Sequence, residues 1–256
     1  MSRDALNSTT PHLGIDTGGT FTDFVLIENG AIRLHKELST PHAPEIAIFR
    51  GLAALGLTEA DISIVHGSTV ATNAVLEHKG VPTALVTNYG LRDMLTIGRQ
   101  ARAELYNLTP RTVSPPVPRD WCLETGGRLG ADGGVVEPLS VAEIARVRDE
   151  IEALAPRAVA VVLLFSYLDP RFEQMIKAAL PATLFVSCSY DILPEQREYE
   201  RGIATWLNSY VGPLLQQYLE RFAAAARPAC VQVMQSSGLA CDPTYAGTHA
   251  IHMLLS

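Results

Sequence analysis

A glycine pair between two short apolar runs, close to the start of the chain, constrains the fold more than any other feature. Residues 14–23 read GIDTGGTFTD, and the apolar run Phe24–Ile27 follows them. Gly18 and Gly19 have no side chains, so the backbone can pass close to an anion there, while the flanking hydroxyls and carboxylates can hold phosphate oxygens and a magnesium ion. The pattern predicts a hairpin that binds nucleotide phosphates.

The residues around the glycines exclude two commoner phosphate-binding loops. A Walker loop needs a Lys-Ser/Thr pair that opens a helix, and a dinucleotide fingerprint needs a third glycine at its helix start. Neither occurs here, because the segment after Asp23 is typical of a strand. A glycine turn between two strands favours the actin, sugar-kinase and Hsp70 superfamily. An ordinary tight turn is the alternative, since tight turns also require Asp, Thr and Gly.

The composition indicates a folded globular chain without a nucleic-acid partner. Of its 256 residues, 47% are hydrophobic and 18% are charged, which suits one sizeable core or two small ones. The net charge is −7 and no basic cluster stands out, so we expect no polyanion-binding surface. Residues 1–11 are polar, and no apolar run reaches the roughly 18 residues of a membrane span. We therefore expect a soluble, cytoplasmic protein.

Strand-like and helix-like segments alternate along the chain, which favours an α/β fold with a mixed sheet and flanking helices. The predicted strands are 13–16, 24–27, 32–37, 62–65, 82–86, 158–164, 183–187 and 231–234. The predicted helices are 44–55, 70–78, 140–154, 171–180 and 199–226. The predicted domains are a disordered lead (1–11), a phosphate-hairpin subdomain (12–106), a second αβ subdomain (107–197), and a long helix with the start of a second half (198–256).

A second candidate loop, HGSTVATN at 66–73, follows a predicted strand and opens a predicted helix. Such a loop offers free amide N–H groups and small hydroxyls that suit an anion or a carbonyl. Ser68 or Thr69 could instead cap the helix, and His66 could be a hydrogen-bonded wall residue. Asn73 lies in the first helical turns, where its amide could face a cleft.

Arginines after Gly98 form a third candidate group. The guanidinium of Arg99 suits carboxylate and imide oxygens, although surface ion pairs would also explain it. Further along, Glu198 and Arg201 are three residues apart, so we expect them to form a structural ion pair on one helix face.

Five motifs in order along nearly the whole chain resemble the hydantoinase A/oxoprolinase family. They are GIDTGGTFTD (14–23), HGSTVATN (66–73), ALVT (84–87), RD with IGRQ (92–100) and LPEQREYER (193–201). The resemblance implies the N-terminal half of an actin-like, ribonuclease H-like fold. It also implies ATP-dependent phosphorylation of a carbonyl or lactam oxygen, followed by ring opening or carboxylation. Family members include N-methylhydantoinase, 5-oxoprolinase and subunits of acetone-type carboxylases.

The resemblance also assigns site residues and cofactors, which we expect to be ATP and Mg. Asp16, Asp23 and His66 are the catalytic candidates, with Asp16 also the metal ligand. The nucleotide-binding candidates are Thr17, Gly18, Gly19, Thr20 and Thr22. Ser68, Thr69, Asn73 and Arg99 are the candidates for binding substrate.

Family members have a second half that begins with a serine-glycine-proline-alanine-glycine-glycine stretch, and this sequence stops about where that stretch would begin. We therefore expect a truncated cyclic-amide hydrolase that is inactive alone, with residues 231–238 as the first strand and turn of a lost domain. The expected partners are a small cyclic amide or ketone, and a hydantoinase B-like subunit or the missing half. An ATP-binding carboxylase subunit and a non-catalytic nucleotide- or partner-binding module are the alternatives.

Overall fold

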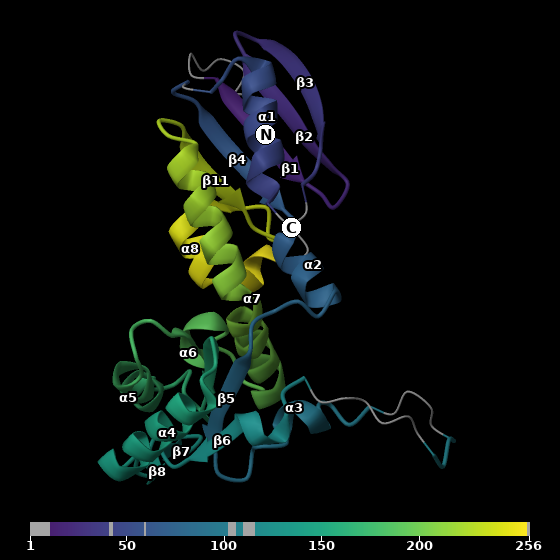
Figure 1. Ribbon diagram of the computed structural model, residues 1–256. Helices are drawn as coiled ribbons and strands as arrows, with labels where there is room; N and C mark the ends of the chain where they lie inside the picture. Colours follow the sequence, from purple (N-terminus) through teal and green to yellow (C-terminus); the bar gives the residue numbers. More distant parts are fainter. Residues whose placement is uncertain (1–10, 41–42, 59, 102–105, 110–115, 255–256) are drawn as a thin grey trace. The chain divides into compact units, whose positions relative to one another are not determined.

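The computed structural model describes residues 11–40, 43–58, 60–101, 106–109 and 116–254 (Figure 1). These residues group into two units, one formed by the chain up to Gly80 together with 211–256, and the other by Val81–Tyr210. The predicted lead at 1–11, apart from Pro11, lies outside the described residues. The predicted segment 12–106 contributes to both units, and the division at 106 and 197 stays a prediction.

In the described part of the chain, unit 1 holds a six-stranded sheet in the order β12-β11-β4-β1-β2-β3. The strands are β1 (His12–Thr17), β2 (Phe21–Glu28), β3 (Ala31–Leu38), β4 (Ser63–Ser68), β11 (Cys230–Met234) and β12 (Ala240–Cys241). β1 pairs antiparallel with β2 and parallel with β4, and β4 pairs parallel with β11. The glycine turn therefore joins two strands, as predicted, and the mixed sheet with flanking helices confirms the predicted fold class.

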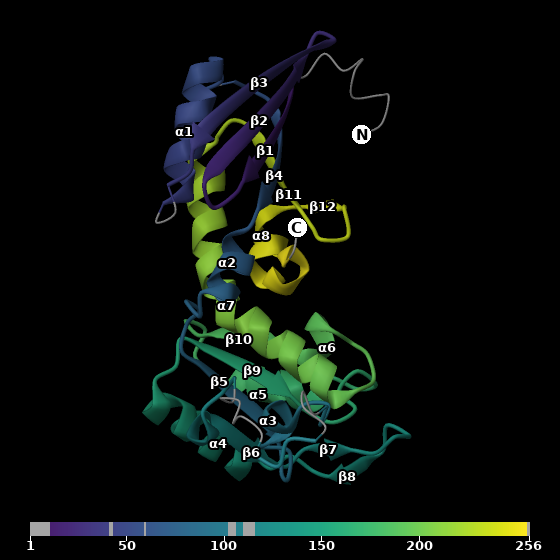
Figure 2. The same ribbon diagram turned by 90° about the vertical axis from the view of Figure 1, so that its right-hand side faces the viewer.

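One face of this sheet is buried because apolar residues alternate along its strands. Leu13, Ile15, Phe24 and Ile64 are all buried. The helices α1 (Pro44–Leu55) and α7 (Glu198–Ala225) cover this face (Figures 1 and 2). Gly51 allows α1 to approach closely, since a Cβ there would lie 2.1 Å from the Phe24 ring.

The C-terminal segment belongs to unit 1, contrary to prediction. We expected residues 231–238 to begin a lost domain, but Val231 pairs with Ile64 and Val233 with His66 in the sheet. Val231 and Val233 alternate onto its buried face, so β11 extends the same core. After β12 come α8 (Pro243–Thr248) and a 3-10 turn, η3 (Ala250–Met253), in which Met253 is buried.

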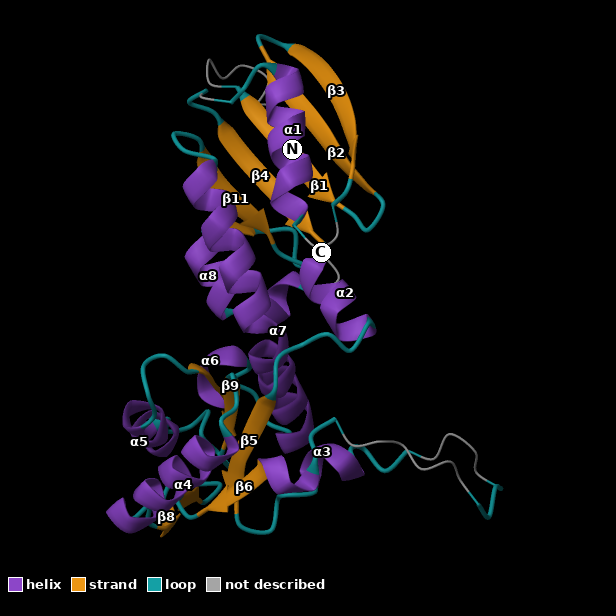
Figure 3. Cartoon of the chain, viewed as in Figure 1, coloured by secondary structure: helices purple, strands orange, loops and turns teal. Residues whose placement is uncertain are grey.

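In the described part of unit 2, four parallel strands form a sheet in the order β10-β9-β5-β6, all four labelled in Figure 2, and Figure 3 distinguishes the strands from the helices of this unit by colour. They are β5 (Thr83–Asn88), β6 (Cys122–Thr125), β9 (Ala158–Val162) and β10 (Phe185–Cys188). One core lies between this sheet and α4 (Val141–Leu154) and α5 (Arg171–Ala179), and the other includes α7 residues such as Trp206. The remaining elements of this unit are α3 (Met94–Ile97), α6 (Ser189–Ile192), η2 (Arg119–Trp121), β7 (Arg128–Leu129) and β8 (Val135–Glu137), while α2 (Val70–Leu76) belongs to unit 1.

Tertiary contacts decide the partners of two charged side chains. Ser140 caps α4 by accepting from Glu143 N, while the Glu143 carboxylate accepts from the Tyr89 hydroxyl and from Gly126 N. Arg201 is buried, and its guanidinium donates to Ser189 Oγ and to the carbonyls of Glu195 and Leu163, so no surface ion pair with Glu198 forms. In both cases distant segments supply better partners than the local helix.

Candidate functional site

The turn between β1 and β2 is held by a chain of short-range hydrogen bonds. Gly18 N donates to Phe21 O at 3.0 Å, and Ser39 Oγ donates to Gly18 O at 2.8 Å. The hydroxyl of Thr22, which is fully buried, lies 3.0 Å from Ser39 Oγ. Thr22 therefore holds the turn through Ser39 on its buried side. Gly19 and Thr20 are exposed at the tip of the turn.

The second predicted loop lies directly beside this turn. Thr17 and Ser68 are partners across the parallel pair β1–β4. The Thr69 backbone N and Oγ1 both donate to Thr17 O at 3.2 Å, and Asn73 Nδ2 donates to Thr69 Oγ1 at 3.3 Å. The Thr69 hydroxyl thus ties the two loops together and does not cap α2, while Ser68 Oγ accepts from Val70 N at 3.2 Å.

A cavity of about 390 Å³ opens where these two loops meet, within unit 1. Its walls come from the glycine turn, the segment before α1, one face of α2 and one face of α7. The residues that line it are Thr17, Gly18, Gly19, Ser39, Thr40, Pro44, Thr69, Val70, Asn73, Ala74, Glu77, Lys79, Leu214, Gln217, Tyr218 and Arg221. The structure therefore brings five predicted site residues, from segments 50 residues apart, around one hollow.

His66 lies beneath this cavity and is fully buried. Its Nε2 is 2.7 Å from the Tyr218 hydroxyl, and the Phe222 ring lies 5.0 Å away between centroids. Burial lowers the pKa of His66 to about 4, against a smaller opposing effect of a backbone hydrogen bond at Ile15, so the ring is neutral near pH 7. Burial raises the pKa of Tyr218, and hydrogen bonds with Thr17 and Ser68 partly oppose this shift. His66 does not line the cavity itself, but it is in hydrogen-bond contact with Tyr218, which does.

The two predicted catalytic carboxylates lie on the other face of the sheet. Asp16 and Asp23 are direct partners across β1–β2, one position from Thr17 and Thr22, so their side chains share the opposite face. Asp23 pairs with Lys36 at 2.7 Å. Asp16 is exposed, and its carboxylate forms no hydrogen bond or ion pair within the described residues. Those residues also contain no cluster of three metal-ligating side chains.

The basic residues of the cavity wall are each paired with a carboxylate. Lys79 Nζ lies 2.5 Å from Glu77, and Arg221 Nε lies 2.9 Å from Glu45. The ammonium and guanidinium groups of Lys79 and Arg221 have more N–H donors than these ion pairs use. Both cations can therefore donate to an anion in the cavity while they keep their carboxylate partners.

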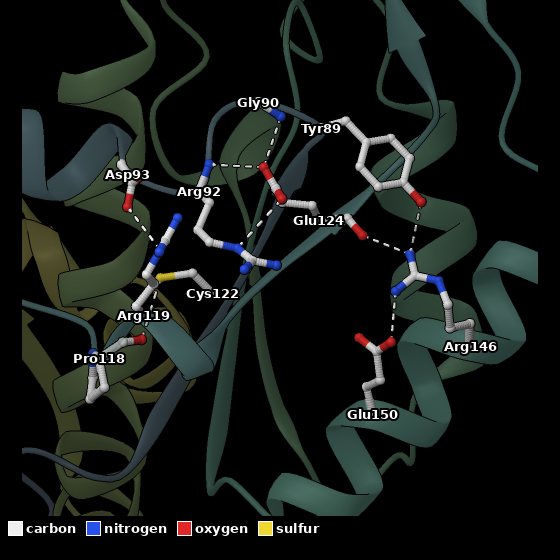
Figure 4. Close-up of polar contacts among 10 residues, drawn as sticks. All are labelled: Tyr89, Gly90, Arg92, Asp93, Pro118, Arg119, Cys122, Glu124, Arg146 and Glu150. Atoms are coloured by element: carbon white, nitrogen blue, oxygen red, sulfur yellow. Dashed lines mark hydrogen bonds and ion pairs between the residues drawn. The ribbon is translucent and has the colours of Figure 1, made fainter.

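Arg99 does not belong to this cavity, since it lies in unit 2 and its Nε donates to Glu200 at 2.6 Å. A separate polar cluster of unit 2 lies at the carboxyl ends of β5 and β6 (Figure 4). There Glu124 accepts from Gly90 N at 2.8 Å and pairs with Arg92 at 3.4 Å, while Arg146 donates to the Glu124 carbonyl at 2.7 Å. These groups satisfy one another, so they fix the loop after β5.

Sequence reasoning missed Tyr218, Arg221, Lys79 and Ser39. Residues 214, 217, 218 and 221 of α7 fall on one helix face by their spacing, and three of them carry polar groups. Nothing in the sequence indicates that this face meets β4, so the pairing of Tyr218 with His66 is a tertiary result.

A sheet ordered β3-β2-β1-β4, with a glycine hairpin joining β1 and β2, defines the actin-like ATPase class of fold. The chain belongs to the family described as the hydantoinase/oxoprolinase N-terminal region, whose model matches residues 12–184. This confirms the family that the five motifs indicated. Within the described residues, no helix is both long and apolar enough to cross a membrane.

Known relatives agree with this assignment. Caprolactamase subunit alpha of Pseudomonas jessenii is 38% identical over 83% of this chain and 33% of its own length. A chain of the crystal structure of the ATP-dependent caprolactamase from Pseudomonas jessenii superposes with a TM-score of 0.79 and 31% identity over 94% of this chain and 38% of that chain. The acetophenone carboxylase gamma subunit of Aromatoleum aromaticum is 30% identical over 84% of this chain and 32% of its own length.

A nucleotide-free structure of acetone carboxylase shares the fold, with a TM-score of 0.83 and 24% identity over 95% of this chain and 38% of that chain. The chain thus spans about a third of the length of the caprolactamase and acetophenone carboxylase subunits.

Proposed function

We propose that this chain is the phosphate-binding N-terminal part of an ATP-dependent enzyme that activates the carbonyl of a lactam or cyclic imide by phosphorylation and hydrolyses the ring. The observation that carries the proposal is the cavity beneath the glycine turn. Gly18 and Gly19 expose backbone there with no side chain in the way, and hydroxyl, amide and basic groups surround it. The caprolactamase relative supports a cyclic amide as the substrate class.

The residues at the turn suit a magnesium nucleotide. ATP would supply the phosphoryl group, and Mg²⁺ is commonly held by one or two carboxylates together with phosphate oxygens and water. Asp16 offers an exposed carboxylate without a protein partner in the described residues, at the same end of β1 as the turn. We assign Asp16 to the metal, Thr17 to Thr20 to the phosphates, and Thr22 and Asp23 to supporting the hairpin.

The remaining site residues divide into contact and positioning groups. Asn73 and Thr69 line the cavity and are assigned to substrate or phosphate oxygens. Ser68 and His66 are assigned to hold Tyr218 in place, because both interact with its hydroxyl. Arg99, whose guanidinium pairs with Glu200 at 2.6 Å, is assigned to carboxylate or imide oxygens of the substrate.

A second candidate function is the ATP-binding part of a ketone carboxylase. The similarity to the acetophenone carboxylase gamma subunit favours it. Both functions share phosphorylation of a carbonyl oxygen, and we propose that a hydantoinase B-like subunit, or a C-terminal half like that of the longer relatives, completes either enzyme. We also propose a cytoplasmic location.

The binding test compares two alanine substitutions in the hairpin. A Cβ at Gly19 would enter the cavity wall, 3.9 Å from Asn73 Nδ2. A Cβ at Gly14, which does not line the cavity, would lie 3.8 Å from the Val25 carbonyl oxygen. Neither contact is too close, so both variants should fold. We expect Gly19→Ala to weaken binding of Mg-ATP about tenfold or more in calorimetry, and Gly14→Ala to leave it unchanged. Equal affinities in all three proteins would refute the phosphate site.

The activity test separates the two functions. ATP turnover is measured with caprolactam, 5-oxoproline or hydantoin, and with acetophenone plus bicarbonate. The measurement uses this chain and a version joined to the C-terminal remainder of its relatives. Lactam-dependent ADP release supports the hydrolase, and ketone- and bicarbonate-dependent release supports the carboxylase.

A further inference from the structure

The outer edge of the unit 1 sheet is a long, uncovered strand. β3 spans eight residues at the end of the strand order, and no strand of the described chain lies beyond it. Ile32, Leu34 and Leu38 are 61%, 74% and 63% exposed on the face opposite α1. An exposed, apolar edge strand offers unpaired N–H and C=O groups that a second strand can occupy. The question is which strand fits.

The free backbone groups of this edge belong to the even-numbered residues. Asn29 and Gly30 both have positive φ and form a two-residue turn that closes at the pair Glu28–Ala31. In such a hairpin the closing pair is hydrogen-bonded and the type of pair alternates from there. Ala31 and every second residue after it therefore bond to β2, while residues 32, 34, 36 and 38 direct their N–H and C=O groups outward.

The side chains of β3 are complementary to a reversed copy of the same strand. An antiparallel partner centred on His35 places Ile32 opposite Leu38 and Leu34 opposite the aliphatic stem of Lys36. It also places Arg33 opposite Glu37, twice by symmetry. Centring on Lys36 would oppose Lys36 to itself, and centring on Leu34 would separate Arg33 from Glu37. Charged side chains on an edge strand normally discourage pairing, but in the register centred on His35 the opposite charges of Arg33 and Glu37 attract each other.

Arg33 and Glu37 make few contacts within the chain, so their side chains can pair across such an interface. Arg33 Nη2 donates to Leu55 O at 3.4 Å, a long hydrogen bond, and Glu37 pairs only with His35, at 3.0 Å, on the described surface. The apolar surface would also be continuous across the two-fold axis, since Val25 and Phe21 of β2 flank Leu34 and Leu38. A symmetric pairing satisfies the rule that a two-fold interface is self-complementary.

We propose that β3 is a homodimerisation edge, at which two copies of this chain pair their β3 strands antiparallel about His35 and continue the sheet across the interface. This surface lies apart from the phosphate cavity, none of whose lining residues belongs to β3, so the proposal does not depend on the enzymatic function.

Charge reversal tests the register directly. Sedimentation velocity of the 256-residue chain over a concentration series should show a monomer–dimer equilibrium. Arg33→Glu and Glu37→Arg should each weaken dimerisation about tenfold, because each variant creates two like-charge pairs. The double variant, which restores opposite charges, should recover the wild-type equilibrium.

Leu34→Lys should also abolish the dimer, by setting a second lysine against Lys36. Leu76→Lys on α2, a leucine of similar exposure outside the edge, should not change the equilibrium. Thermal unfolding of each variant checks that the fold is retained. A wild-type chain that is monomeric throughout, or a double variant that is no better than the single ones, would overturn the proposal.

Discussion

The buried His66–Tyr218 pair makes the stability of unit 1 depend on pH in a predictable direction. In the folded chain the pKa of His66 is about 4, and its ordinary value is 6.5. Between these values the unfolded chain binds a proton that the folded chain does not, so protonation favours the unfolded state. The folded pKa is depressed, and the contribution of His66 is therefore fully present above pH 6.5 and is lost as the pH falls toward 4.

The size of the effect follows from the shift. A difference of 2.5 pKa units, 6.5 less 4, corresponds to about 3 kcal/mol of unfolding free energy. The steepest slope for a single proton is about 1.4 kcal/mol per pH unit. Below pH 4 the folded ring takes up its proton as well, and the dependence on this residue levels off.

The variant His66→Gln isolates this effect, because glutamine can accept from the Tyr218 hydroxyl at 2.7 Å but does not titrate. Urea unfolding of both proteins is measured from pH 7.5 to pH 4. The unfolding free energy of the wild type minus that of His66→Gln should fall by about 3 kcal/mol over that range. The contributions of the other titrating groups are the same in both proteins and cancel in this difference. A difference that stays constant with pH would refute the assignment of His66 as a buried neutral group.

Three further predictions concern the turn, the core and unit 2. Asp16→Ala in the complete enzyme should abolish ATP-dependent turnover and leave the melting temperature unchanged, since the carboxylate is exposed; normal turnover would remove it from the site. Gly51→Ala should lower stability by roughly 1–3 kcal/mol in urea unfolding, because its Cβ would overlap the Phe24 ring, and an unchanged midpoint would contradict that packing. Arg201→Met should lower the unfolding free energy by about 3 kcal/mol or more in urea unfolding, since two buried acceptors and the partly buried Glu195 carbonyl lose their donor, whereas the exposed control Arg148→Met should have a much smaller effect.

The sequence alone determined the local elements. The glycine pair predicted the β1–β2 turn, and alternating apolar residues predicted the strands on either side of it, because both depend on neighbours along the chain. The predicted helix 44–55 has the observed bounds of α1. The loop 66–73 was recognised as a site candidate for the same reason: a strand, small polar residues and a helix follow in direct succession.

Only the tertiary structure decided where the later segments belong. The periodicity of residues 231–234 predicts a strand but cannot say which strand is its neighbour, and pairing with β4 placed it in unit 1. Similarly, Tyr218 is one aromatic residue among several in a long helix, until the packing of α7 on the sheet sets its hydroxyl against His66, 152 residues away. Helix and strand patterns arise from local periodicity, whereas burial and hydrogen bonding at this cavity depend on contacts between segments that the sequence keeps far apart.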